Sequence, residues 1–296
     1  MAENRRIVAA HDTTDSAGSI DRPPERPDAM FQVASGVYGG VLLAGIATIL
    51  AGAIDGWPAG LESTSAGGFL AGALGGFLLA RVDERLPIRL GRSAVRRVAL
   101  ALPALVFLGT WFAPFETPAN HVTLVIALLV FASGYALSQL AGNRYVDAMA
   151  PGNPERTWEW EPVGTPVADI VIAIMWAVLA IGNAAVGNWL EGLVWLTIAG
   201  FWVGSCLAEG RWSFGPGRER CEVQCYETGL VRRRPYTKRF VAWDDVGHVR
   251  LRNGELVLDS GLRDVRFDRD ELADADAFLE AVDERLTSGV GTNDGR

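Results

Sequence analysis

A basic cluster in the last third of the chain holds the residues best suited to bind a charged ligand. Guanidinium and ammonium groups attract anionic lipid headgroups, each contributing about 1 kcal/mol in ordinary salt. Alternate residues of a strand point to opposite faces, so the bases are not expected to converge on one ligand. The alternatives are specific lipid binding, nonspecific membrane apposition, and a solvated or acid-paired strand edge. The cluster places five bases within eight residues: Arg232, Arg233, Arg234, Lys238 and Arg239.

The carboxylate of Asp169 lies in an otherwise apolar segment and is the second candidate. An acid within a membrane suggests ion or solute transport by default. However, Asp169 is only one turn into its segment, where the helix dipole stabilises a carboxylate that can also reach the interface. The apolar segments hold no paired charges deep in their core, which argues against an ion-coupled transporter.

Catalytic and metal-binding motifs do not appear in the sequence. It contains no HExxH, phosphate-loop or GxSxG pattern, and its three histidines are far apart. Cys221 and Cys225 could share one face of a strand, but a metal site needs two more ligands, and both are interpreted as core residues. We therefore expect no enzyme activity, no cofactor, no metal and no nucleic-acid partner.

The apolar part of the chain is predicted to form membrane helices. Apolar residues make up 49% of the sequence and concentrate between Phe31 and Ala208. About 20 helical residues cross a hydrocarbon core of ~30 Å, so we predict a domain of six transmembrane helices over 30–208, with the second and third of marginal length. The predicted segments are 31–54, 66–80, 98–115, 122–142, 166–186 and 189–208.

Arginine placement predicts the orientation of these helices. Arginines occur before the first segment, between the second and third, and between the fourth and fifth, whereas the other three connecting loops have no Lys or Arg. Positive loops stay in the cytoplasm, so both termini are expected there, in a multi-pass protein of the cell membrane. Trp158 and Trp160 precede the fifth segment and are interpreted as interface anchors.

The charge composition suggests a salt-adapted source. The formal net charge is −8 and Lys238 is the only lysine, which resembles the proteins of salt-adapted archaea. In molar salt the Debye length falls to about 3 Å or less, so only direct contacts of the basic cluster would survive.

A glycine strip in the second segment offers a close-packing face. Gly68, Gly72 and Gly76 recur at four-residue spacing. Such a strip lets another helix backbone approach closely. It would serve either homo-oligomerisation or packing among the six helices.

Beyond a linker at 209–217, apolar and polar residues alternate in several short stretches, which predicts short strands, and the chain then ends in one predicted amphipathic helix. Asn253-Gly254 is its strongest hairpin signal. From Asp268 the apolar period changes to that of a helix face, and Asp268 with Glu271 is similar to a capping box. The predicted helix face consists of Leu272, Ala275, Leu279, Val282 and Leu286.

This module, over 218–287, resembles the prokaryotic PH-like domain. The family often has a proline before its tryptophan, where this chain has Ala242. The resemblance implies an α+β half-open barrel closed by one helix, and the family has no shared catalytic residues to carry over. The residues that carry the resemblance are Glu227, Gly229, Leu230, Val241, Trp243, Asp244, Asp245 and Val246, with the terminal helix.

We therefore expect a multi-pass membrane protein, in contact with the lipid bilayer, that presents a cytoplasmic PH-like domain for interaction with a protein partner or for scaffolding. The alternative is a small transporter or channel that this domain regulates. The polar ends at 1–29 and 288–296 are expected to be disordered, the first as a cytoplasmic tail.

Overall fold

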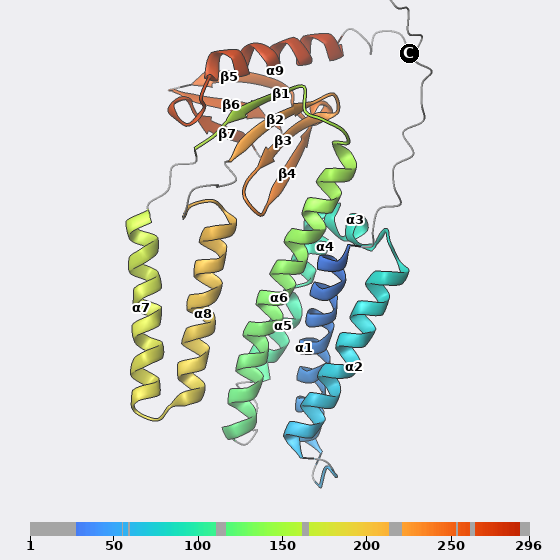
Figure 1. The fold of residues 1–296 in the computed structure, drawn as a ribbon, viewed down its shortest axis with the longest axis vertical. Helices are drawn as coiled ribbons and strands as arrows, with labels where there is room; N and C mark the ends of the chain where they lie inside the picture. Colours follow the sequence, from blue (N-terminus) through green and yellow to red (C-terminus); the bar gives the residue numbers. More distant parts are fainter. Residues whose placement is uncertain are drawn as a thin grey trace, which may run out of the picture.

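The computed structural model describes residues 28–54, 56–58, 60–110, 117–161, 166–212, 221–252, 254–260 and 264–290. It consists of a group of helices with two sheets and a final helix at one end (Figure 1). The end of the helices at which the sheets lie is called the sheet end below. Almost all of the two predicted tails and most of the predicted linker lie outside the described residues.

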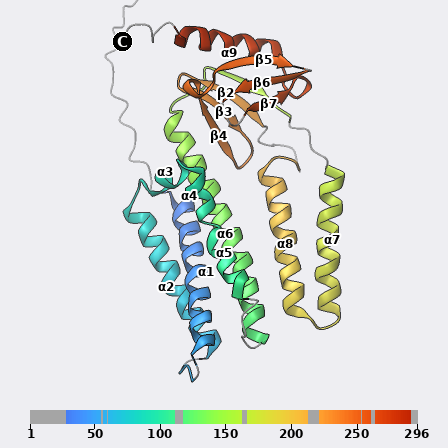
Figure 2. The same cartoon turned by 180° about the vertical axis from the view of Figure 1, so that it is seen from behind.

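Five helices among the described residues are long and apolar enough to cross a membrane, and the chain is accordingly a multi-pass membrane protein. Two views place α6 between α8 and α1 (Figures 1 and 2), and α6 contacts both. The second helix begins before the predicted residue 66 and is 22 residues long. The five helices are α1 (Ala29–Ala53), α2 (Leu61–Val82), α6 (Thr117–Met149), α7 (Pro166–Ala185) and α8 (Trp189–Ala208).

Five of the six predicted membrane helices are found among the described residues, and the third predicted segment is not one continuous helix there. The described residues of the segment predicted as one helix over 98–115 lie in and around α4 (Ala94–Ala99) and α5 (Leu102–Gly109), which follow α3 (Leu86–Gly91). Residues 111–115 of that segment lie outside the described residues. All three short helices contact α6. Pro103 lies in the first turn of α5, where a proline fits, but its ring prevents α4 from continuing as one regular helix.

The glycine strip of α2 packs against α1. A Cβ on Gly72 would lie 2.1 Å from the backbone oxygen of Gly39, and one on Gly76 would lie 2.2 Å from that of Ser35. Gly68 faces the backbone oxygen of Leu43 in the same way. The strip therefore serves packing within the chain, and α1 covers the face that was considered for homo-oligomerisation.

The strands pair as two antiparallel sheets, in the orders β1-β2-β3-β4 and β5-β6-β7. No barrel is found among the described strands. Short 3-10 turns at Trp243–Asp245 and Arg269–Glu271 link the later elements. The strands are β1 (Arg156–Glu159), β2 (Glu222–Tyr226), β3 (Gly229–Arg233), β4 (Lys238–Ala242), β5 (His248–Arg252), β6 (Glu255–Asp259) and β7 (Val265–Asp268).

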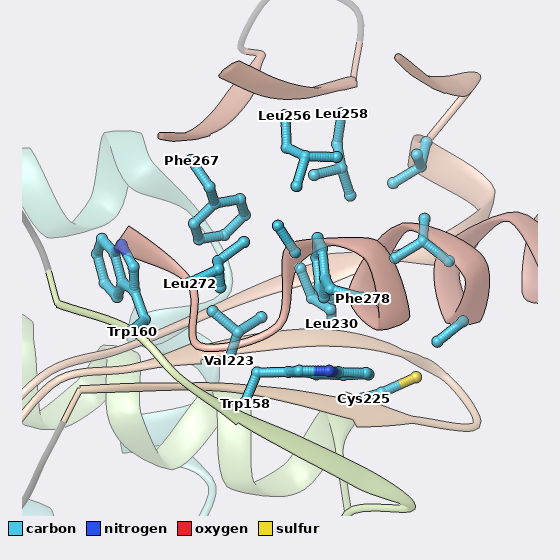
Figure 3. Close-up of a cluster of buried hydrophobic side chains, with 14 of the residues drawn as sticks. Trp158, Trp160, Val223, Cys225, Leu230, Leu256, Leu258, Phe267, Leu272 and Phe278 are labelled. Carbon is cyan, nitrogen blue, oxygen red and sulfur yellow. The ribbon is translucent and has the colours of Figure 1, made fainter. Parts of the chain in front are cut away.

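The final helix, α9 (Ala275–Val290), buries an apolar face between the sheets (Figure 3). Phe278 is fully buried, with its ring centroid 5.6 Å from that of Phe267. Of the predicted helix face, Ala275 and Val282 are buried and Leu279 and Leu286 pack partly buried against the core. Leu272 precedes the helix, which begins later than Asp268. The later start follows from Asp274, whose carboxylate accepts the N–H of Ala277 at 3.0 Å and so caps the helix.

The first strand comes from the connection between α6 and α7, outside the predicted module. Arg156 of β1 lies opposite Cys225 of β2 in an antiparallel ladder. Trp158 and Trp160 are 7% and 4% exposed and belong to the core, so their interpretation as interface anchors is wrong. The set β1–β7 with α9 is called the sheet unit below, and the α7–α8 hairpin is inserted between its first two strands.

Candidate functional site

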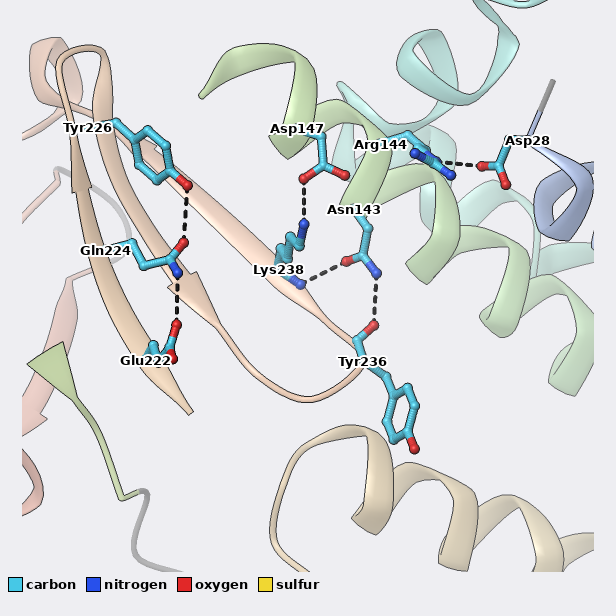
Figure 4. Close-up of polar contacts among 9 residues, drawn as sticks. All are labelled: Asp28, Asn143, Arg144, Asp147, Glu222, Gln224, Tyr226, Tyr236 and Lys238. Atoms are coloured by element: carbon cyan, nitrogen blue, oxygen red, sulfur yellow. Dashed lines mark hydrogen bonds and ion pairs between the residues drawn. The ribbon is translucent and has the colours of Figure 1, made fainter. Parts of the chain in front are cut away.

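The β3–β4 hairpin contacts the last turns of α6, through a set of bonds that we call the clasp (Figure 4). The 33 residues of α6 are about 50 Å long, more than the ~30 Å hydrocarbon core, so one end projects from the membrane. The amide of Asn143 donates to the carbonyl of Tyr236 at 2.8 Å and accepts the backbone N–H of Lys238 at 2.7 Å. The Lys238 ammonium lies 2.5 Å from the Asp147 carboxylate.

Apolar contacts extend the clasp. Val146 of α6 and Ala150, which directly follows α6, form a buried cluster with Val231 of β3, against which Tyr226 and Phe240 pack. These side chains cover the face of the sheet opposite the α9 core. The hairpin is therefore held to the membrane helix by both polar and apolar contacts, which fixes the sheet unit in position at the sheet end.

The five predicted bases divide between the two faces of the hairpin. Lys238 lies opposite Arg233 in the ladder, on the face that contacts α6. Arg232 lies opposite Arg239 on the other face, and Arg234 follows two residues later, just beyond the strand. The expectation that the bases cannot all converge is confirmed, but three of them do share one face.

Trp160 supports two of these three arginines. The guanidinium carbons of Arg232 and Arg234 lie 4.9 and 5.1 Å from the centroid of its ring. Burial lowers the pKa of Arg232 to about 10, and the charges of Arg234 and Arg239 act in the same direction. Burial also lowers the pKa of Arg234, whose buried Nε has no hydrogen-bond partner. With a pKa of about 10, Arg232 remains a cation at neutral pH.

Asp169 forms a buried ion pair at the sheet end of the α7–α8 hairpin. Its carboxylate lies 2.8 Å from Nη1 of Arg211, a residue that follows α8. Nε of the same arginine lies 3.2 Å from the Glu209 carboxylate. The indole of Trp202 donates to the backbone carbonyl of Asp169 at 3.3 Å. The pair therefore joins the start of α7 to the end of α8.

A polar pocket of about 270 Å³ lies between β1 and α9. Arg156 lies 3.4 Å from Glu284, and Arg285 pairs with Glu155, so two ion pairs cross the pocket. Cys225 at its base is 2% exposed, and burial raises the pKa of its thiol. Because each of these charged side chains is paired with an opposite charge, we interpret the pocket as the contact between β1 and α9.

Sequence reasoning found the basic hairpin but missed its partners on α6. The available signal was the polar stretch after Gly142, where Asn143 and Asp147 continue the spacing of one helix face. Within the described part of the chain, no three His, Cys, Asp or Glu side chains come together as a metal site. Comparisons with protein-family models, curated proteins and solved structures found no match.

Proposed function

We propose that this membrane protein presents a PH-like interaction or scaffolding unit at the cytoplasmic face of the cell membrane. The observation that carries the proposal is the clasp, which holds the sheet unit against α6 through Asn143 and Lys238. A unit fixed in this way offers one constant surface to a partner, as a scaffold requires. The proposal assigns no reaction to the protein.

Three features support the finer parts of the proposal. Two antiparallel sheets in consecutive order, followed by one helix, are consistent with the PH-like resemblance. Arginine-rich connections at the sheet end favour a cytoplasmic orientation. The acid excess and single lysine favour a salt-adapted archaeal source.

Transport has less support from the contacts. Asp169, the acid that suggested it, is held by Arg211 at the end of the helices. A carboxylate paired in this way serves to close the α7–α8 hairpin, and no contact among the described residues favours a solute or ion path.

Photo-crosslinking of the full-length protein in its native cells tests the interaction function. A photoreactive residue replaces Leu251, which is 46% exposed on β5, and the matched control replaces Leu74, which is 61% exposed on the membrane helix α2. We expect protein adducts at residue 251 and lipid adducts alone at residue 74. Lipid adducts alone at both positions would contradict an interaction unit. A reporter fused after Arg296 that is active only outside the cell would contradict the orientation.

A further inference from the structure

We propose that Arg232, Arg234 and Arg239 form a binding site for a phosphate group, such as that of an anionic lipid headgroup. The three side chains share one face of the β3–β4 hairpin. Within the part of the chain that the structure describes, none of the three forms an ion pair with a carboxylate. Lys238 is excluded from the site because Asp147 holds it on the opposite face.

Among the described residues no carboxylate lies within ion-pair distance of the three arginines, although the charges of Glu271 and Glu209 act on Arg232 and Arg234 from farther away. Neighbouring cations that are partly removed from water repel one another, and an anion between them offsets that cost. Burial, and then the charges of Arg234 and Arg239, lower the pKa of Arg232 and so disfavour its charged form. Nε of Arg234 is a buried donor without an acceptor, which is rare in folded proteins unless a ligand or water supplies one.

Guanidinium geometry selects phosphate among anions. The planar fork of arginine binds phosphate oxygens in pairs, with charge-assisted hydrogen bonds. Trp160 restrains two of the three forks through its ring, so less side-chain freedom is lost on binding. The ring is itself fixed, because its Nε1 donates to the Glu271 carboxylate at 3.0 Å.

The site lies at the depth of lipid headgroups. The 20 residues of α8 are about 30 Å long, enough to cross the hydrocarbon core, and the helix ends at Ala208. Gly210 follows, and a Cβ there would lie 3.1 Å from Pro235 at the tip of the hairpin. The tip therefore touches the end of a membrane helix, which brings the neighbouring arginines level with the headgroup phosphates.

Thermal unfolding of the full-length protein in a neutral detergent tests this site. The probes are dihexanoyl phosphatidic acid, inorganic phosphate, and dihexanoyl glycerol, which lacks the phosphate. In molar sodium chloride, where screening removes long-range attraction, we expect a saturable rise in Tm with phosphatidic acid and none with dihexanoyl glycerol. A comparable rise with inorganic phosphate identifies a free phosphate as a ligand, and a response to phosphatidic acid alone identifies the lipid.

The variant R234Q/R239Q should weaken phosphatidic acid binding roughly 100-fold or more, since two charge-assisted bonds are lost and each contributes about a factor of 10 or more. The matched control R250Q/R252Q removes two exposed charges from β5 and should bind like the wild type. The single variant R239Q, at an exposed position, decides the matter if the double variant does not fold. No saturable shift in the wild type, or full binding by R239Q and by a folded R234Q/R239Q, would overturn the proposal.

The identification of a lipid as the ligand rests on the membrane placement proposed above, whereas the test with inorganic phosphate does not. If no protein adducts form at residue 251 but phosphate still binds, the scaffold function is contradicted and the phosphate site stands. If protein adducts form but phosphate does not bind, the phosphate site is contradicted and the scaffold function stands.

Discussion

Replacing Asn143 by alanine should release the β3–β4 hairpin from α6. Its amide makes two hydrogen bonds to the hairpin backbone, at 2.7 and 2.8 Å, and alanine makes neither. A net contribution of about 0.5–1.5 kcal/mol for each bond gives a total of about 1–2 kcal/mol, with the exposed bond at the lower end. That free energy corresponds to a factor of roughly 5–30 in the population of the released hairpin.

The ion pair of the clasp should matter less than the amide. Both members of the Asp147–Lys238 pair are substantially exposed, with 43% and 31% of their side-chain surfaces accessible. Exposed pairs contribute about 0.2–1 kcal/mol and are screened by salt. We therefore expect D147N to perturb the hairpin less than N143A, and least of all at high salt.

Hydrogen exchange of the full-length protein in lipid nanodiscs measures both effects. The backbone N–H of Lys238 should exchange roughly 5–30 times faster in N143A than in the wild type. The matched control is N183A, because among the described residues the amide of Asn183 bonds to the carbonyl of Leu179 within its own helix. Unchanged exchange at Lys238 in N143A would refute the clasp, and a uniform increase across the sheet unit would show a general loss of stability instead.

Three further substitutions test other contacts. R211Q leaves the buried Asp169 carboxylate without its cation, so the unfolding free energy in detergent should fall by about 3 kcal/mol, and part of it should return in D169N/R211Q. G72A drives a methyl group into α1 and should cost about 1–3 kcal/mol by the same measurement, whereas G75A meets open space and should change nothing. F278A should remove about 3–5 kcal/mol from the sheet unit, seen as faster hydrogen exchange in β6.

Hydropathy predicts the long membrane helices well because about 20 apolar residues have few other ways to satisfy their backbone in lipid. It cannot show that α6 continues to Met149, since a helix that leaves the membrane needs no apolar residues. It also misses the break between α4 and α5, where one proline outweighs an apolar composition suited to a span.

At the candidate site, too, local features are predicted from the sequence whereas long-range contacts are not. Strand alternation correctly separates Arg232 from Arg233, because the period of two is a local property. The pairing of β1 with β2 is not local, since Arg156 and Cys225 meet only after a membrane hairpin. The two tryptophans before α7 are therefore ambiguous in sequence, where an interfacial residue and a core residue have the same composition.

The insertion of α7 and α8 between β1 and β2 imposes an order on biosynthesis. When β1 leaves the ribosome, its partner strand has not been made, and Trp158 and Trp160 have no core to enter. The sheet unit can close only after the hairpin has crossed the membrane and returned. Its closure then reports that the last two helices have inserted with both ends on the same side, and a chain that fails this step would expose two large aromatic side chains to quality-control proteases.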